Sequence, residues 1–556
     1  MRSFFLLSPS VLSVCFVFCP IVSSPVLAQI TPDGTLGSES TIVSPNQTID
    51  NLPADLIQGG ATRGSNLFHS FLEFNVNAGQ RVYFGNPTGI DRILSRVTGS
   101  DISDILGTLG VNGGADLFLI NPNGIIFGPN AQLDISGSFV GSSAESIVFS
   151  EFEFSATNPT APPLLTVNFS PTGLRFGANA GDIRLQPGES PQLVLVTEDS
   201  DAGQLLETAQ GVNPEPATVP NQIQGELSTN NDVDLYQVFL PAGSTIAPST
   251  VGGSTVDTRL FLFDQLGLGL VANDDSQGTF QSALPEITQS GVYYLGISSW
   301  ENSALSAEGP IFTFFPDGSG PGANAPLISW DNSGFDSGSY TISLASPAPR
   351  TGNLAVPPGQ SLALIGGNVR LEEGKILSPG SNVYIGGVSG AGVVPLESGL
   401  HPILPAQLPR ADIGLFDTEI NVRGGGGGAI VLEGDNIDIL GGSTRVRAGI
   451  ESGQGFSGAQ AGDVKINGTG GITIDGAAVS NTVIDNGTGK SGNIFINSDS
   501  LSLLNSGRIV NESFGLPNSD LGNIVITVSQ IEISGAFGGI FNRVRPGVIA
   551  NSGNVS

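Results

Sequence analysis

The sequence is short of positive charge, of charged residues in general and of cysteine. Its 556 residues include 20 Lys and Arg against 50 Asp and Glu, for a formal net charge of −30, and charged residues make up only 13% of the chain. Without a basic surface the protein has little to attract the phosphates of a nucleic acid, so we expect no nucleic-acid binding. The shortage of charged helix-forming residues also argues against a helical bundle or a coiled coil.

Both cysteines, Cys15 and Cys19, lie in an apolar N-terminal segment. Arg2 precedes the apolar run, and the small-residue end at Ala28 has the pattern that signal peptidase cleaves, which predicts a signal peptide over residues 1–28. An uncleaved membrane anchor is the alternative, but prolines leave the run short of the ~20 apolar residues that a span needs. The mature chain would hold no disulfide, and we expect it to be secreted or displayed at the cell surface via the periplasm.

Glycine is what the chain has in excess, with 78 residues, while 39% of the residues are hydrophobic and the mean hydropathy is +0.16. Glycine at twice its usual frequency favours turns over helices. The apolar content is high enough to offset the conformational entropy of an ordered chain. The composition therefore predicts an all-β fold of short strands.

The C-terminal part, residues 350–556, contains an internal repeat. A glycine followed by Asp or Asn and by alternating Ile or Val recurs every 30 residues, at Gly462, Gly492 and Gly522, and a second apolar run follows each of them. Strand-like units at a fixed period indicate a solenoid, here a parallel β-helix with Ile and Val inside. The last residue falls inside a repeat, so we expect the β-helix to continue beyond the chain end.

The middle of the chain differs from both ends in its composition and residue pattern. Residues 191–220 are rich in Pro and acidic residues and are predicted to be a linker, and a second Pro-rich linker is predicted at residues 346–349. Between them, residues 221–346 hold both tryptophans and four of the six tyrosines, in alternating patterns typical of an antiparallel β-sandwich. We predict that this sandwich interrupts a single β-helix.

The N-terminal part carries a specific series of motifs, among them Leu67-Phe68-His69-Ser70-Phe71, Arg96-Val97-Thr98-Gly99 and Asn121-Pro122-Asn123-Gly124-Ile125. The series resembles the N-terminal secretion domain of the filamentous haemagglutinin family, in its cyanobacterial type. The resemblance implies a right-handed parallel β-helix over residues 29–190 that directs export by two-partner secretion, through an outer-membrane β-barrel transporter bearing POTRA domains. The secretion motif that it implies comprises Asn66, Leu67, Asn121, Pro122, Asn123, Gly124 and Ile125.

The middle segment resembles the bacterial pre-peptidase C-terminal domain, through Asp232-Val233-Asp234-Leu235-Tyr236 and Asn273-Asp274-Asp275 among other residues. Some members of that family are associated with calcium. Carboxylate oxygens are the ligands that Ca²⁺ prefers, and this segment offers Asp232, Asp234, Asp257, Asp274 and Asp275. The alternative is that these side chains cap turns by bonding their own backbone. We expect no other cofactor.

Two functions from different classes remain. The first is a secreted exoprotein, an adhesin that binds an unknown surface or glycan ligand. The second is a secreted β-helix enzyme that acts on extracellular polysaccharide, which would need facing carboxylates. The mature chain has only two histidines, His69 and His401, and no cysteine, while acids of the coils such as Glu433, Asp435 and Asp438 are scattered. We therefore favour the exoprotein and expect no enzyme activity.

Overall fold

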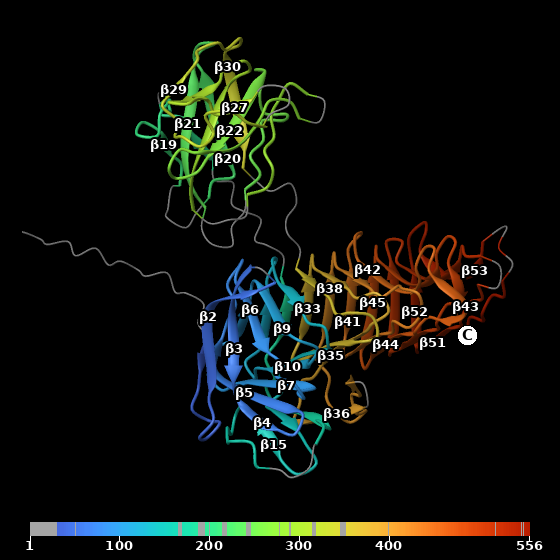
Figure 1. Cartoon of the computed structure of the whole chain (residues 1–556). Coiled ribbons are helices and arrows are strands. Elements are labelled where there is room, and N and C mark those ends of the chain that lie inside the picture. Colours follow the sequence, from blue (N-terminus) through green and yellow to red (C-terminus); the bar gives the residue numbers. More distant parts are fainter. Residues whose placement is uncertain are drawn as a thin grey trace, which may run out of the picture.

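Every regular element of the described chain is a β-strand (Figure 1). The computed structural model describes residues 30–50, 52–164, 169–186, 195–199, 201–213, 219–240, 246–276, 279–287, 291–313, 318–344, 352–397, 400–516, 519–545, 548 and 550–556. In these residues there is no helix long and apolar enough to cross a membrane. The predicted signal peptide and the predicted linker at residues 346–349 lie outside them. The prediction of an all-β fold is confirmed.

Three long sheets run side by side along the coiled part of the molecule. Sheet A consists of β1 (Ile30–Pro32), β4 (Ala61–Arg63), β5 (Asn66–Phe74), β7 (Arg92–Val97), β10 (Asp116–Ile120), β13 (Phe139–Ser142), β32 (Ser361–Gly366), β35 (Asn382–Gly387), β40 (Ile430–Gly434), β44 (Val464–Gly468), β48 (Ile494–Asn497) and β51 (Ile524–Thr527). Sheet B consists of β2 (Thr41–Ile49), β3 (Leu52–Gly59), β6 (Arg81–Gly85), β9 (Thr108–Asn112), β12 (Gln132–Asp134), β31 (Asn353–Leu354), β34 (Lys375–Leu377), β39 (Glu419–Asn421), β42 (Arg445–Ile450), β46 (Ala478–Val483), β50 (Arg508–Ser513) and β53 (Gly539–Val544). Sheet C consists of β8 (Ser103–Ile105), β11 (Ile125–Phe127), β17 (Ile183–Leu185), β33 (Val369–Glu372), β38 (Ile413–Phe416), β41 (Ile437–Leu440), β45 (Gly471–Asp475), β49 (Ser500–Leu504) and β52 (Gln530–Ile533).

Strands of successive coils pair in parallel within each sheet, which makes the predicted parallel β-helix. In sheet A the pairing aligns Leu362 with Val383, then with Ile430 and Val464 of the following coils. These side chains are buried in one continuous core, so every added coil extends the same apolar stack. The Ile and Val positions of the 30-residue repeat are therefore the inward positions of the coil.

The Asp or Asn that follows each repeat glycine links neighbouring coils on the outside. The Oδ1 atom of Asp463 accepts hydrogen bonds from the backbone N and from Nδ2 of Asn493, at 2.8 and 3.0 Å. Asn523 donates its backbone N–H to Oδ1 of Asn493 at 2.9 Å, and Asn554 donates in the same way to Asn523. This ladder explains why the repeat keeps a short carbonyl-bearing side chain at that position.

A five-stranded antiparallel sheet, which was not predicted from the sequence, covers the outer face of sheet A. It consists of β14 (Ser146–Val148), β15 (Glu153–Ser155), β16 (Gly173–Phe176), β36 (Gly392–Glu397) and β37 (His401–Pro402), and we call it the cap. Phe118 and Ile120 of β10 face a second core beneath the cap, whereas Leu117 and Leu119 face the core inside the coil. The β-helix predicted over residues 29–190 thus carries an additional antiparallel layer, because a strand that is apolar on both faces needs a layer on each side.

Residues 195–344 form sheets of their own, drawn in green and yellow in Figure 1, and we call this part the module. One sheet contains β18 (Leu195–Thr197), β20 (Gln222–Leu227) and β30 (Gly338–Ser343), and the other contains β19 (Gln210–Gly211), β21 (Val233–Leu240), β24 (Gly291–Ser299), β22 (Thr258–Phe263) and β23 (Gly269–Asn273). Short strands follow at β25 (Ala304–Ser306), β26 (Gly309–Pro310), β27 (Phe312–Thr313), β28 (Gly318–Ser319) and β29 (Ser329–Trp330). The two larger sheets share one apolar core, which includes Ile223 and Ile342 from the first and Leu262 and Leu295 from the second.

The module enters the coil at one corner, between β17 of sheet C and β31 of sheet B. The predicted linker over residues 191–220 differs from the structure, which pairs β18 with β20 and β19 with β21. β18 and β19 each run parallel to the strand that they pair with. Parallel strands need a long connection, so the short-range hairpin signals of a sequence do not indicate this pairing. The chain therefore joins the module's sheets well before residue 221.

Candidate functional site

The turn Asn121-Pro122-Asn123-Gly124 connects β10 to β11 at a corner of the coil. Asn121 is fully buried, and its Oδ1 atom accepts hydrogen bonds from the backbone N and from Nδ2 of Asn123, both at 3.0 Å. The turn closes with a bond from the backbone N of Gly124 to the carbonyl oxygen of Asn121 at 2.9 Å. The two asparagines thus fix the conformation of the turn through their own side chains.

The same turn is bonded to the coils on both sides of it. Toward the preceding coil, Asn121 donates from Nδ2 to the carbonyl oxygen of Asp101 at 2.9 Å, and Asn123 donates from Nδ2 to that of Gly99 at 2.9 Å. Toward the following coil, Gly181 donates its backbone N–H to the carbonyl oxygen of Pro122 at 2.9 Å. The motif therefore joins three successive coils at one corner.

Gly124 and Ile125 complete the motif by backbone conformation and burial. Gly124 has φ of 117°, and a Cβ atom there would stand 2.5 Å from the carbonyl oxygen of Asp182. Only glycine fits such a conformation and such a close approach. Ile125 is fully buried and aligned with Ile183 in sheet C, so it anchors the turn to the core of the coil.

Asn66 and Leu67 lie at the start of β5, in the first coil. Leu67 points into the core of the coil. Asn66 is 2% exposed and donates from Nδ2 to the carbonyl oxygen of Phe169 at 2.7 Å, in the segment that leads into β16. Both residues lie far along the chain from the Asn121 turn. Asn66 holds the segment before β16 to the coil, whereas Leu67 packs inside the coil.

Arg96 holds the cap in the same way, and the sequence analysis did not recognise this role. Its fully buried guanidinium donates to the carbonyl oxygens of Ser155 at 2.8 Å and Thr160 at 3.0 Å, and lies 4.1 Å from the ring centre of Phe154. Burial lowers the pKa of Arg96 to about 10, against the opposing effect of the nearby Asp33 carboxylate. This role could not be predicted, because the carbonyl oxygens that bind Arg96 lie far along the chain and leave no periodic pattern in the sequence.

The five predicted calcium ligands fall into two separate groups. One group brings Asp232 and Asp234 together with Asp201, and the other brings Asp257 together with Asp274 and Asp275. Within each group, one carboxylate oxygen per residue lies within 4.8 Å of the others. Asp201 was missed because it stands in the segment that was predicted to be a linker.

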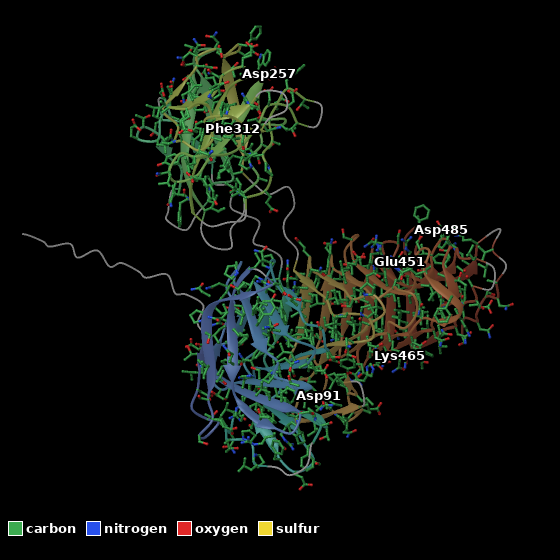
Figure 2. All side chains as sticks on the ribbon, viewed as in Figure 1. Asp91, Asp257, Phe312, Glu451, Lys465 and Asp485 are labelled. Atoms are coloured by element: carbon green, nitrogen blue, oxygen red, sulfur yellow. The ribbon has the colours of Figure 1, made fainter. Side chains whose placement is uncertain are left out.

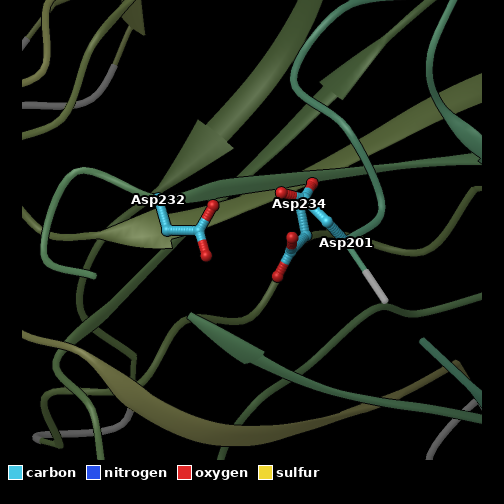
Figure 3. Close-up of side chains that lie close together, drawn as sticks. All are labelled: Asp201, Asp232 and Asp234. Carbon is cyan, nitrogen blue, oxygen red and sulfur yellow. The ribbon is translucent and has the colours of Figure 1, made fainter. Parts of the chain in front are cut away.

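Asp234 is the most constrained residue of the first group (Figure 3). It is fully buried, its Oδ2 atom accepts a hydrogen bond from the hydroxyl of Tyr340 at 2.6 Å, and its Oδ1 atom receives no hydrogen bond from the described residues. Burial raises the pKa of Asp234 to about 8, and the negative charges of Glu198 and Asp232 add to this against the Tyr340 hydrogen bond. Its group partners Asp201 and Asp232 line an open cavity of about 420 Å³, together with the acids Glu198, Asp199 and Glu226.

Asp232 also caps a turn, as the alternative interpretation expects. Its Oδ2 atom accepts the backbone N–H of Ser228 at 2.6 Å, and its Oδ1 atom accepts that of Val233 at 3.0 Å. In the second group, burial together with the charges of Asp275 and Asp336 raises the pKa of Asp257 to about 6. Turn capping therefore accounts for Asp232, but it does not account for the buried Oδ1 atom of Asp234, which receives no hydrogen bond from the described residues.

The residues weighed for enzyme chemistry lie apart and are engaged elsewhere. His69 is fully buried and its ring lies 5.4 Å from that of Phe84. Glu433 accepts the hydroxyl of Tyr384 at 2.5 Å beneath the cap. Asp435 accepts the hydroxyl of Thr469 at 2.6 Å at an exposed corner. Their contacts are those of packing and of links between coils.

Comparison with known proteins gives a family match for the N-terminal part of the chain. Residues 28–239 match the TPS secretion domain. The matched range contains the first coils, the Asn121 turn and the first strands of the module. No curated protein matches the chain. Among solved structures, the HMW1 secretion domain from Haemophilus influenzae is similar with 12% identity and a TM-score of 0.43, covering 93% of this chain and 99% of its own. The filamentous hemagglutinin secretion domain is similar with 13% identity and a TM-score of 0.26, covering 94% of this chain and 99% of its own.

Proposed function

We propose that this chain is an exoprotein exported by two-partner secretion, through an outer-membrane β-barrel transporter that bears POTRA domains. The observation that carries the proposal is the match of residues 28–239 to the TPS secretion domain, within which the Asn121 turn joins three coils. The final location is the cell surface or the medium, reached through the periplasm after removal of residues 1–28.

Folding of the coil can supply the driving force for export. Each coil that forms outside the membrane buries the inward apolar side chains of one more turn, at roughly 25 cal/mol per Å². The absence of cysteine after residue 19 suits this route, because no disulfide can lock the chain before it has crossed. The exposed sides of the coils would then present a long surface, and we propose an adhesin that binds a surface or glycan ligand.

Co-expression tests the proposal. The chain should appear outside the cell when a gene for a POTRA-bearing barrel is expressed with it, and should stay in the periplasm without that gene. Equal export without the partner would overturn two-partner secretion. Degradation of extracellular polysaccharide by the purified chain would instead favour the enzyme alternative.

We further propose that the module binds calcium at Asp201, Asp232 and Asp234. The buried oxygen of Asp234 that receives no hydrogen bond from the described residues, together with a cavity that Asp201, Asp232 and other carboxylates line, supports this assignment. Both tryptophans lie in the module, so their fluorescence reports its unfolding within the full chain. We expect its melting temperature to rise with added Ca²⁺ and not with added Na⁺ at equal ionic strength, because a ligand that binds only the folded state stabilises it. No shift with Ca²⁺ would leave turn capping as the explanation.

A further inference from the structure

The module carries negative charge almost exclusively. Residues 195–344 contain 18 Asp and Glu and one basic residue, Arg259. The side chain of Arg259 is fully buried, and its Nη2 atom donates to the carbonyl oxygen of Thr313 at 2.9 Å. The described surface of the module therefore presents carboxylates with no cation among them, and any partner that it attracts over a distance must be positively charged.

One part of this surface also exposes aromatic rings. Phe335 is 68% exposed, and its ring centre lies 6.3 Å from that of Trp300, which is partly exposed. Phe280 is 69% exposed, and its carbonyl oxygen accepts the backbone N–H of Thr258 at 3.1 Å. Large exposed aromatic rings that lie close together indicate a contact surface, because their burial against a partner is favourable.

The second carboxylate group lies directly beside these rings. The backbone N–H of Trp300 bonds to the carbonyl oxygen of Asp257 at 3.0 Å, and Phe335 and Asp336 both donate their backbone N–H groups to the hydroxyl of Ser299, at 2.8 and 2.7 Å. Asp257 in turn has a carboxylate oxygen within 4.8 Å of Asp275, and its Oδ1 atom has no hydrogen-bond partner among the described residues. Figure 2 shows Asp257 near the top of the module in that view.

We propose that this aromatic and acidic surface, made of Asp257, Asp275, Trp300, Phe335 and Asp336, docks a basic protein segment. A guanidinium or ammonium group can bond the carboxylates while it stacks on the exposed rings, and the two contacts reinforce each other. A metal ion would need the carboxylates but not the rings. The combination favours an arginine-rich or lysine-rich partner over a metal, and it goes beyond the export function because the surface lies outside the coil.

The test measures binding of an acetylated peptide of alternating Arg and Gly to the mature full chain by calorimetry, with a Gln and Gly peptide as the neutral probe. We expect the Arg peptide alone to bind. D257N/D275N should raise its Kd about tenfold, and F335A should raise it about threefold. The matched controls are E207Q/E308Q, which removes two exposed charges elsewhere on the module, and L266A, which truncates another residue that is 64% exposed.

The outcomes separate the alternatives. If E207Q/E308Q weakens binding as much as D257N/D275N, only the overall charge of the module acts and the proposal is wrong. If neither peptide binds, the surface does not dock a basic segment. If Ca²⁺ displaces the Arg peptide from the wild-type chain, and D257N/D275N binds one Ca²⁺ fewer than the wild type, the group holds a metal and the proposal is overturned. Unchanged tryptophan fluorescence melting of each variant shows that the module stays folded.

Discussion

Asn123 donates a hydrogen bond from its Nδ2 atom to the carbonyl oxygen of Gly99 at 2.9 Å, and this bond spans one full coil. The turn that holds Asn123 is thus a joint between coils as well as a corner of its own coil. A chain that folds as it emerges from a membrane must close each coil on the one before it. Under the proposed export function, we expect the Asn121 motif to act in that step.

Replacing Asn123 with Ala and Gly124 with Ala together should destabilise the N-terminal coils and lower export. The first change removes the bonds from Nδ2 of Asn123 to Gly99 and to Asn121, each worth about 1 kcal/mol. The second places a Cβ atom 2.5 Å from the carbonyl oxygen of Asp182 at φ of 117°. The measurement is the secreted fraction together with the denaturation midpoint by circular dichroism.

The control for this pair is N112A/G114A, in the same domain. Asn112 is exposed, and a Cβ atom at Gly114 would meet nothing within 4 Å. Export of the control should match the wild-type chain. If the Asn123 and Gly124 variant is also exported and folded as well as the wild type, the turn has no special role.

Protonation of His69 should weaken the first coil in acid. Burial lowers the pKa of His69 from 6.5 to about 3, so between these pH values the unfolded chain binds a proton that the folded chain does not. Stability then falls as the pH drops below 6.5, at up to about 1.4 kcal/mol per pH unit. We expect H69Q to show a flatter dependence of unfolding free energy on pH between 6.5 and 4.5 than H401Q, which serves as the control. Identical slopes for the two variants would contradict the burial of a neutral His69.

Asp234 should make the module less stable as the pH rises in the absence of calcium. Its pKa is raised from 3.8 to about 8, so the folded state holds a proton that the unfolded chain has lost. The stability that this proton provides is complete below pH 3.8 and is lost as the pH rises through 8. In a chelator, D234N should therefore remove the pH dependence and exceed the wild-type melting temperature at pH 8, as followed by tryptophan fluorescence.

At pH 8, added calcium should raise the melting temperature of the wild-type module above that of D234N. The wild-type module gains about 2.7 kcal/mol when Ca²⁺ is a hundredfold above its Kd, whereas D234N lacks a ligand and gains less. E226Q, which removes an exposed acid that lines the same cavity, is the matched control for loss of charge alone. An equal gain for wild type and D234N would place the calcium elsewhere.

The sequence predicted those parts of the fold that rest on local periodicity. Ile466, Ile496 and Ile526 occupy aligned positions of successive coils, so their spacing of 30 residues follows directly from the length of one turn of the coil. The cap escaped prediction because its pairing of β16 with β36 joins residues more than 200 positions apart, as Leu174 and Val394 do. Asp257 was a predicted ligand, but its separation from Asp232 and Asp234, and the place of Asp201 next to these two, follow from tertiary folding alone.

Deleting the module should leave a complete coil. Leu185 of β17 aligns with Leu371 of β33, and Asn353 of β31 aligns with Lys375 of β34. In the next coil, Leu371 and Lys375 are separated by Glu372, Glu373 and Gly374, so the register places Gln186 at the position of Glu372 and Gly352 at that of Gly374. One residue is missing between them, and its counterpart Glu373 has φ of 50°.

A single glycine that joins Gln186 to Gly352 therefore closes the corner without strain, because glycine adopts that φ freely. A solenoid tolerates such a change since each coil touches only its neighbours. The shortened chain should be exported with the partner barrel and keep its β-rich circular dichroism spectrum, and it should lose calcium binding and binding of the Arg peptide. A proline in place of the joining glycine is the matched control and should impair folding, because proline cannot reach a positive φ. Failure of the glycine variant to leave the cell in a folded form would show that the module is an integral part of the coil.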